Sequence, residues 1–269
     1  MRGWPLRIYV ILMLAFLYAP ILLLPIFAFN DAAIIAFPLA GFSTRWFEQL
    51  WSTPALHQAL RNSLVIATVT ALLATTLGVC AARAGAMASF PGKRAMLGFV
   101  MLPLVLPEII VAVALLIVVR QVLDLDLSNW TVIAAHTVIC MPFSIAILNG
   151  AFQNLDPSYE EAAMDLGEGR WGAFRLVTLP LVMPGIVSSL LICFIISLDD
   201  FVLAQFLTGQ NPTLPVYIYG LTRFVDALPV IMALGTILVT LSITLLIIAE
   251  WFRRRGLARA GIKDSGGFL

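Results

Sequence analysis

Long apolar stretches alternate with short polar segments along the whole chain. A helix needs about 20 apolar residues to cross a bilayer. Six stretches are close to that length, and we expect transmembrane helices at about 8–29, 63–82, 95–119, 130–148, 181–207 and 228–251. The first stretch is longer than the roughly 7–15 apolar residues of a signal peptide, so we interpret it as a retained helix. The pattern predicts an all-α polytopic membrane protein with six transmembrane helices.

One polar segment, Asp156–Pro180, is too polar to cross a bilayer and yet has the start and stop signals of helices. Asp156 is a favourable N-cap, and Pro157 suits the first helical position. Gly167 and Gly169 would end this helix. Its apolar positions recur at helical spacing: Tyr159, Ala162, Ala163 and Leu166. A second short helix, with Trp171, Phe174 and Val177 along one side, is expected to run to Pro180. We interpret the two helices as a docking element.

Composition supports a membrane protein, because 61% of the 269 residues are apolar and only 12% are charged. A soluble domain carries about 25% charged residues. The net charge is +1 and no basic patch interleaves with aromatic residues, so nothing indicates nucleic-acid binding. We expect a single transmembrane domain over 1–269, with a peripheral first helix at about 8–29 and a core at about 58–251.

The distribution of lysine and arginine predicts the orientation. With six helices, both termini lie on one side of the membrane. That side would carry twelve of the sixteen basic residues, and the other side would carry four. Because positive charge is retained in the cytoplasm, we expect the termini and the segment 156–180 to be cytoplasmic in a bacterial inner membrane.

Four ionisable residues fall inside the expected helices: Glu108, His136, Asp199 and Asp200. At a rise of about 1.5 Å per residue, all four lie in the outer half of the bilayer. Intramembrane ionisable groups commonly line a cavity or meet a partner, so we expect an acid-lined path that favours cations. Asp200 is the better candidate of the two aspartates, because it shares a helix face with Ser189, Cys193 and Ser197.

Structural roles remain open for the same residues. Glu108 follows Pro107 and could satisfy backbone groups freed by proline. His136 could be an ordinary packing histidine. Either aspartate could lie at the outer interface or cap a broken helix. The sequence alone does not separate these roles from a place on a transport path.

The sequence contains no recognisable catalytic or cofactor-binding pattern, neither a nucleophile elbow nor a Walker P-loop. Cys80, Cys140 and Cys193 lie in apolar stretches without metal-ligand spacing, and we expect them to be buried, inert thiols. We therefore predict no metal site, no cofactor and no enzymatic activity in this chain. A transporter that has no ATPase site of its own must take its energy from an ion gradient or from a partner.

The polar segment resembles the EAA loop of type I ABC importer permeases. Glu161-Ala162-Ala163, Gly167, Val177 and Leu179-Pro180 match EAA-x3-G-x9-I-x-LP, with valine in place of isoleucine. The resemblance implies a coupling helix that docks in a groove of a cytoplasmic ATPase. Small alanines suit a deep groove, and Glu161 could pair with a basic residue there. The coupling residues implied are Tyr159, Glu160, Glu161, Ala162, Ala163, Leu166, Gly167, Leu179 and Pro180.

The rest of the chain is similar to the second membrane subunit of spermidine/putrescine permeases. The similar segments include GFSTRWFEQL, LPLVLPEI, AHTVICMPF and SLDDFVLAQFLTG. The resemblance implies a heterodimer with a homologous permease, two ABC ATPase subunits that bind ATP and Mg²⁺, a periplasmic binding protein and a polyamine substrate.

Three alternatives remain beside this expectation. The permease could import another small solute, such as an opine or an amino-acid-like compound. The chain could be an ion-coupled secondary transporter in which Glu108 or Asp200 carries protons, although such proteins often contain inverted repeats and we find no repeat. A membrane-embedded enzyme is disfavoured because no active-site set is recognisable.

Overall fold

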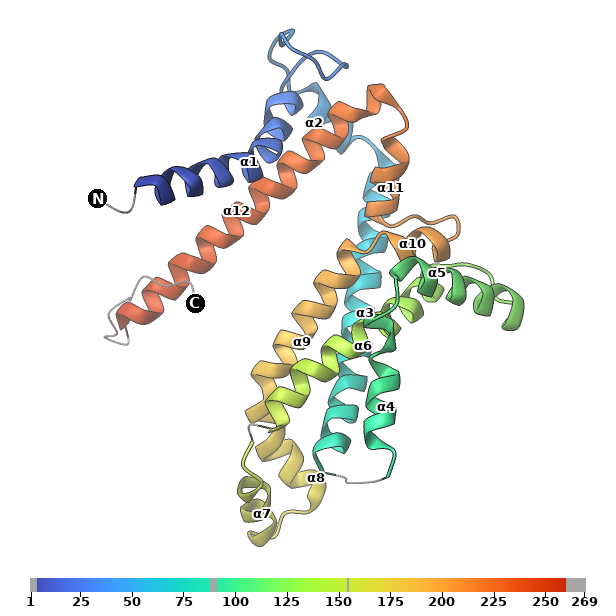
Figure 1. The fold of residues 1–269 in the computed structure, drawn as a ribbon, viewed down its shortest axis with the longest axis vertical. Coiled ribbons are helices and arrows are strands. Elements are labelled where there is room, and N and C mark those ends of the chain that lie inside the picture. Colours follow the sequence, from blue (N-terminus) through green and yellow to red (C-terminus); the bar gives the residue numbers. More distant parts are fainter. Residues whose placement is uncertain (1–3, 88–90, 154, 260–269) are drawn as a thin grey trace. The chain divides into compact units, whose positions relative to one another are not determined.

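A computed structural model describes residues 4–87, 91–153 and 155–259, and these residues are predominantly helical (Figure 1). The contacts divide the chain into two compact units, Met1–Pro54 with Ile218–Leu269, and Ala55–Tyr217. Within the described residues, five helical stretches are long and apolar enough to cross a membrane: Leu6–Ala28, Pro54–Ala86, Asn129–Gln153, Arg170–Asp199 and Val225–Thr244. The expected all-α membrane fold is confirmed.

The first unit consists of α1 (Trp4–Ala28), α2 (Arg45–Trp51), the short 3-10 helix η4 (Val225–Ala227) and α12 (Leu228–Arg259). Both α1 and α2 pack against α12 (Figure 1). The connection between α1 and α2 is fixed at Asn30, whose carbonyl oxygen accepts a hydrogen bond of 2.7 Å from Trp46 Nε1. Asn30 Oδ1 accepts a second hydrogen bond from Ala40 N at 2.9 Å.

The second unit is built on three long helices, α3 (Pro54–Met87), α6 (Asn129–Gln153) and α9 (Leu179–Asp199). Small residues allow α6 to pack closely on its neighbours, as is common between membrane helices. A Cβ atom at Gly185 of α9 would lie 2.7 Å from Ala151 Cβ of α6. A Cβ atom at Gly78 of α3 would lie 2.0 Å from Ser144 Oγ of α6.

Hydroxyl groups also join these three helices. Ser189 Oγ of α9 donates to Ser144 Oγ of α6 at 2.8 Å and lies 3.0 Å from Thr75 Oγ1 of α3. All three side chains are buried. The stretch 63–82 of α3, rich in alanine and threonine, therefore packs closely on α6 and α9.

The stretch expected to form one helix at 95–119 is broken, so that prediction is wrong. It contains α4 (Lys93–Val100), the 3-10 turn η1 (Leu102–Leu104) and α5 (Glu108–Ile117), followed by the π-helical turn η2 (Val118–Val122). Pro103 and Pro107 explain the break, because proline lacks an amide donor and disfavours helical geometry in the residue before it. Glu108 is therefore the first residue of α5 and does not lie inside a continuous helix.

The stretch expected at 181–207 also differs from the prediction. Its helix α9 ends at Asp199, and a separate helix α10 (Val202–Leu207) follows Asp200 and Phe201. At the other end, α8 (Arg170–Ala173) and the π-helical turn η3 (Phe174–Thr178) continue directly into α9. The second short helix therefore does not stop at Pro180, which follows a turn where the α-helical hydrogen-bond ladder is already interrupted.

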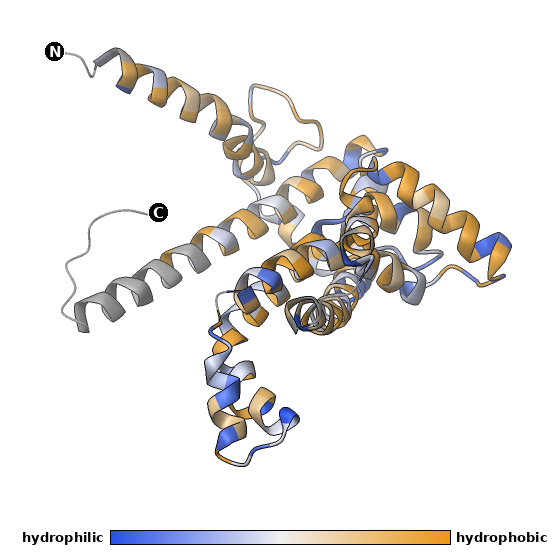
Figure 2. Cartoon of the chain, turned by 60° about the horizontal axis from the view of Figure 1, so that its bottom comes forward, coloured by the Kyte–Doolittle hydropathy of each residue, from blue (hydrophilic) through white to orange (hydrophobic). Residues whose placement is uncertain are grey.

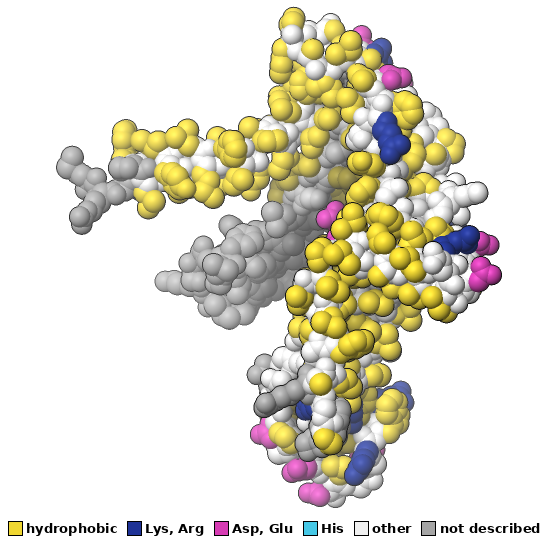
Figure 3. All heavy atoms as spheres, turned by 45° about the vertical axis from the view of Figure 1, so that its right-hand side comes forward, with side chains coloured by type: hydrophobic (Ala, Val, Ile, Leu, Met, Phe, Trp, Pro, Cys, Tyr) yellow, Lys and Arg dark blue, Asp and Glu magenta, His cyan; other side chains and the backbone are white. Residues whose placement is uncertain are grey.

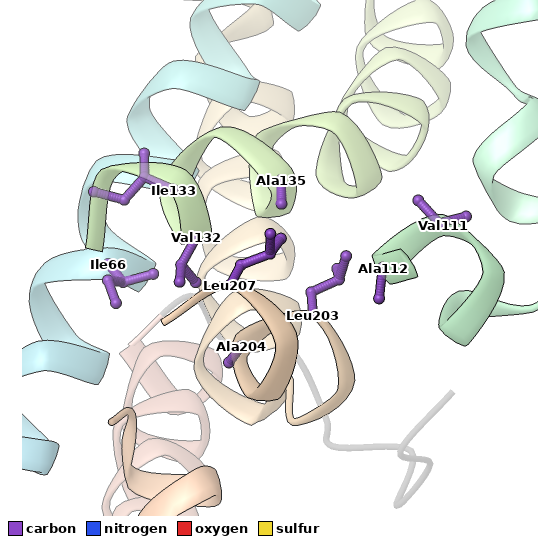
Figure 4. Close-up of a cluster of buried hydrophobic side chains, with 9 residues drawn as sticks. All are labelled: Ile66, Val111, Ala112, Val132, Ile133, Ala135, Leu203, Ala204 and Leu207. Carbon is purple, nitrogen blue, oxygen red and sulfur yellow. The ribbon is translucent and has the colours of Figure 1, made fainter. Parts of the chain in front are cut away.

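After the break that follows α9, α10 packs against α5 and α6. Its apolar side chains join those of α3, α5 and α6 in one buried cluster (Figure 4). The cluster contains Ile66, Val111, Ala112, Val132, Ile133, Ala135, Leu203, Ala204 and Leu207. The next helix, α11 (Leu214–Leu221), begins beside α3, where Leu214 N donates to Ser63 Oγ at 2.8 Å.

Candidate functional site

The polar segment forms the predicted first helix, α7 (Ser158–Asp165). Asp156 caps it, because Asp156 Oδ1 accepts a hydrogen bond of 3.0 Å from Ser158 N, and Pro157 has helical backbone angles. This hydrogen bond lowers the pKa of Asp156 below that of a free aspartate, since it favours the ionised carboxylate. The predicted helix start is confirmed.

The predicted end of α7 at Gly167 is also confirmed. Gly167 has φ +98°, a left-handed conformation that favours glycine. Glu168 N donates to Ala163 O at 3.1 Å, and Gly167 N donates to Met164 O at 3.0 Å. This is the paired hydrogen bonding of a Schellman C-cap. The glycine turn therefore reverses the chain into α8, as the sequence predicted.

Most of the expected coupling residues of α7 are exposed. Tyr159 is 54% and Leu166 is 88% exposed, and Glu161 and Ala162 are exposed as well. Ala163 is buried against the rest of the unit, and Glu160 is half-buried. Of the two alanines expected to enter a groove, only Ala162 therefore lies on the outer surface. Leu179 and Pro180 belong to the continuous helix that follows.

Hydrophilic residues are frequent at the end of the second unit that carries α7 and α8 (Figure 2). Charged side chains gather there, whereas the neighbouring flank is hydrophobic (Figure 3). The end carries Glu160, Glu161, Asp165, Glu168, Arg170 and Arg175. Tyr159 and Leu166 are exposed among these charges. A helix with exposed apolar residues inside a charged surface is suited to binding another protein.

Glu160 differs from Glu161 in pointing inward. Glu160 Oε1 lies 3.3 Å from Arg83 Nη1 and accepts a hydrogen bond from Thr178 Oγ1. The contact with Arg83 is electrostatic, without hydrogen-bond alignment. The Arg83 guanidinium also stacks over Phe174, 3.8 Å from the ring centroid. We did not single out Arg83 or Thr178 from the sequence, where the only signal was a basic residue at the end of an apolar stretch.

Two of the four expected intramembrane residues, His136 and Asp200, form a buried pair. His136 Nε2 lies 3.3 Å from Asp200 Oδ1, and His136 Nδ1 lies 2.7 Å from Ser197 Oγ. Asp200 Oδ1 also accepts a hydrogen bond of 3.2 Å from Ala204 N in α10. Asp200 therefore joins the break between α9 and α10 to His136 of α6. The His136 side chain is 1% exposed and that of Asp200 is 5% exposed.

Glu108 and Asp199 are the exposed acids of the set. Glu108 starts α5 and lies near enough to Asp200 to interact with it. Asp199 is the last residue of α9 and does not share the buried face of Asp200. The sequence favoured Asp200 over Asp199 as the residue facing a cavity. Within this chain the face of Asp200 is instead packed, because Ser189, Cys193 and Ser197 are buried on it.

The cysteines agree only in part with the expectation of buried thiols. Cys140 and Cys193 are buried and donate to each other's backbone carbonyl oxygens, at 3.6 and 3.7 Å. Cys80 is exposed on this chain, so the expectation is wrong for this residue. The apolar stretch around Cys80 did not indicate which face of the helix the side chain occupies. In the described part of the chain, no group of three or more His, Cys, Asp or Glu side chains has the arrangement of a metal site.

A hollow of about 350 Å³ lies beside η1 and α5. It is lined wholly by apolar side chains, among them Phe99, Leu106 and Ile110. It contains none of the four intramembrane ionisable residues, so its lining is unsuited to a cation. The acids therefore are at the helix breaks and not in this hollow.

Sequence comparison places the chain among transport proteins. The family model described as binding-protein-dependent transport system inner membrane component matches residues 74–256. The spermidine/putrescine transport system permease protein PotC of Shigella flexneri is 32% identical over 254 residues, covering 94% of this chain and 93% of the relative. The putrescine transport system permease protein PotI of Escherichia coli K12 is 36% identical over 245 residues, covering 87% and 85%.

Structural comparison gives the same fold. A crystal structure of a bacterial ABC transporter that imports the acidic polysaccharide alginate contains a chain with a TM-score of 0.72 at 16% identity, covering 94% of this chain and 95% of that chain. The alginate transporter in complex with a periplasmic protein bound to an alginate pentasaccharide matches with a TM-score of 0.68 at 22% identity, covering 91% and 93%. These likenesses establish an ABC importer permease fold.

Proposed function

Because this chain belongs to the family of binding-protein-dependent transport system inner membrane components, we propose that it passes a polyamine, of the putrescine and spermidine class, into the cell. The chain is a membrane-spanning permease subunit of an ABC importer. The names of its relatives PotC and PotI support the polyamine. The acids at the helix breaks also support a cationic solute, because carboxylates attract amines through charge-assisted hydrogen bonds. An opine or an amino-acid-like solute is the competing possibility.

The observation that carries the rest of the proposal is the exposed helix α7 with its glycine turn. We assign to it the docking of a cytoplasmic ATPase, through Tyr159, Glu161, Ala162 and Leu166. Two ATPase subunits would bind ATP and Mg²⁺, and this chain would bind no cofactor. A homologous permease would complete the membrane unit, and a periplasmic binding protein would deliver the solute.

The mechanism proposed is alternating access. Closure of the ATPase dimer on ATP draws the coupling helices together and opens the permease pair toward the loaded binding protein. Hydrolysis then returns the pair to an inward-facing state. Glu108 and Asp199 offer exposed carboxylates for an entering amine. His136 and Asp200 would hold the break between α9 and α10, where Asp200 lies near Glu108.

Co-purification with the candidate partners tests whether this chain assembles with ATPase subunits. We expect vanadate-sensitive ATPase activity in the complex containing this chain, and its loss when Leu166 and Tyr159 are both replaced by aspartate. Their side chains are exposed, so the change should spare the fold. A native chain that recruits no ATPase would refute the proposal, and a gradient-driven uptake without ATP would favour a secondary transporter.

Uptake by the reconstituted importer tests the solute and the path. We expect uptake of labelled putrescine to fall about tenfold in Glu108→Gln or Asp199→Asn, the effect of losing one charge-assisted hydrogen bond. Asp126→Asn is the matched control, because Asp126 is a fully exposed carboxylate that pairs with Arg120 outside the site. If an opine, but no polyamine, is imported, the polyamine assignment is wrong. Normal putrescine uptake in both variants would remove these acids from the path.

A further inference from the structure

Glu160 points inward, away from the exposed side chains of α7 that are proposed to dock an ATPase. Its side chain is 17% exposed, whereas the adjacent Glu161 is exposed. One carboxylate oxygen, Oε1, lies 3.3 Å from Arg83 Nη1 and accepts a hydrogen bond from the hydroxyl of Thr178. Arg83 lies in the last turns of α3, and Thr178 immediately precedes α9. A single side chain of α7 therefore contacts the long helix α3 and the turn η3 that continues into α9.

Arg83 is itself held in place. Its guanidinium lies 3.8 Å above the Phe174 ring, a cation–π arrangement, and its side chain is 23% exposed. Phe174 belongs to a buried cluster drawn from α3, α6, η3 and α9. The cluster contains Ala82, Leu148, Phe152, Phe174 and Val182. The partners of Glu160 are thus parts of a packed frame.

Hydrophobic packing fixes α7 only weakly. The helix has eight residues, and Ala163 is its one buried residue. Its larger apolar side chains, Tyr159 and Leu166, are exposed. A short helix with so little buried area is ordered by other contacts. The pairing of Glu160 supplies such contacts at low exposure, where an ion pair is screened less than at an open surface.

We propose that Glu160 is a positioning residue that fastens the coupling helix to α3 and α9 through Arg83 and Thr178. The inference rests on the proposed docking of an ATPase at α7 and adds a separate task on the opposite face of that helix. When the ATPase displaces α7, Glu160 pulls on the cytoplasmic ends of α3 and α9 together. Because α9 ends at Asp199, the displacement passes along one helix to the acids at its other end.

The amount of putrescine imported per ATP hydrolysed measures how well Glu160 couples α7 to α3 and α9, separately from the docking of the ATPase. The assembled importer is compared with Glu160→Gln, Arg83→Gln and the double variant, with labelled putrescine as the probe. We expect each single variant to retain its ATPase subunits and to import about fivefold less putrescine per ATP, the scale of coupling between contacting residues. The double variant should lose less than the two single losses multiplied, because neither partner is left as an unpaired charge. Asp165→Asn, an exposed carboxylate of the same helix, is the control.

A distance measurement does not depend on the solute. Spin labels are placed at positions 164 on α7 and 72 on α3, whose native side chains are 40% and 53% exposed, in a Cys80→Ser background. We expect one narrow distance distribution that shifts as a whole when ATP and vanadate are added. In Glu160→Gln the distribution should broaden, and the label on α7 should move without a matching change in uptake.

The outcomes separate the two proposals. If the unaltered chain recruits no ATPase, the docking proposal fails, and with it the basis of this one. If the ATPase is recruited but Glu160→Gln leaves the uptake ratio and the distance distribution unchanged, Glu160 fastens nothing and only this inference fails. Loss of the ATPase from Glu160→Gln, with an unchanged distribution, would make Glu160 a docking residue instead.

Discussion

At the scale of single residues, Gly167 allows the cleanest test of how α7 is ended. Its φ is +98°, and a Cβ atom there would meet nothing within 4 Å. The cost of Gly167→Ala is therefore conformational alone, about 1 kcal/mol. We expect the amides of α7 to exchange with deuterium about fivefold faster. Gly169→Ala is the matched control, because Gly169 has φ −73° and equally open surroundings. If Gly169→Ala raised the exchange rate as much as Gly167→Ala or more, the C-cap at Gly167 would be contradicted.

Asp156 gives α7 a dependence on pH. The hydrogen bond from Ser158 lowers the pKa of Asp156 in the folded segment. The cap is therefore fully effective above the ordinary aspartate pKa and is lost as the pH falls through the lowered value. We expect hydrogen exchange at the start of α7 to show this loss only below the ordinary aspartate pKa. Asp156→Asn should keep the cap and remove the pH dependence, and an unchanged acid response in that variant would exclude Asp156 as its cause.

Local signals in the sequence predicted the residues that cap α7, since an aspartate, a proline and a glycine act within a few positions of themselves. They did not predict that Glu160 points inward, because that orientation depends on Arg83, which is distant in sequence. The exposure of Cys80 was missed for the same reason. A single residue in an apolar stretch carries no information about which helix its side chain meets.

At the scale of elements, glycines set the separation of α6 and α9. We expect Gly185→Ala to destabilise the purified chain by about 1–3 kcal/mol, because its Cβ atom would lie 2.7 Å from Ala151 Cβ. Gly150→Ala on α6 is the control, since a Cβ atom there meets nothing within 4 Å. This change should be neutral or stabilising by up to about 1 kcal/mol. Thermal unfolding in detergent measures both, and equal unfolding temperatures would mean that this contact does not limit packing.

Hydropathy predicted the long helices but not the breaks within them. Averaging over about 20 residues joined α4, η1 and α5 into one expected helix, although Pro103 and Pro107 were visible. It likewise joined α9 and α10 across Asp200. At both breaks the residue responsible was noted in the sequence as a charge or a proline. What the pattern could not give was the partner that stabilises the break, namely His136 at Asp200.

At the scale of the whole molecule, the fold class and the family were predictable and the path was not. The fold class follows from the number and length of apolar stretches. The EAA spacing belongs to a contiguous segment, so it is legible in one sequence. A transport path depends on which helix faces meet one another. Periodicity placed Asp200 on the face of Ser197, and only tertiary structure shows that this face packs on α6.

The orientation in the membrane is the prediction that concerns the whole chain. Twelve of its sixteen basic residues would lie on the side of the termini and α7, which predicts that this side is cytoplasmic. One cysteine at a time is introduced in a Cys80→Ser background, in which the remaining Cys140 and Cys193 are buried. An impermeant maleimide then labels the introduced cysteine in intact cells. We expect labelling at positions 126 and 210, whose side chains are exposed, and at position 168 beside Gly167 only after permeabilisation. Labelling at position 168 in intact cells would place α7 outside, where no ATP-driven partner could reach it, and the proposed docking would then be untenable.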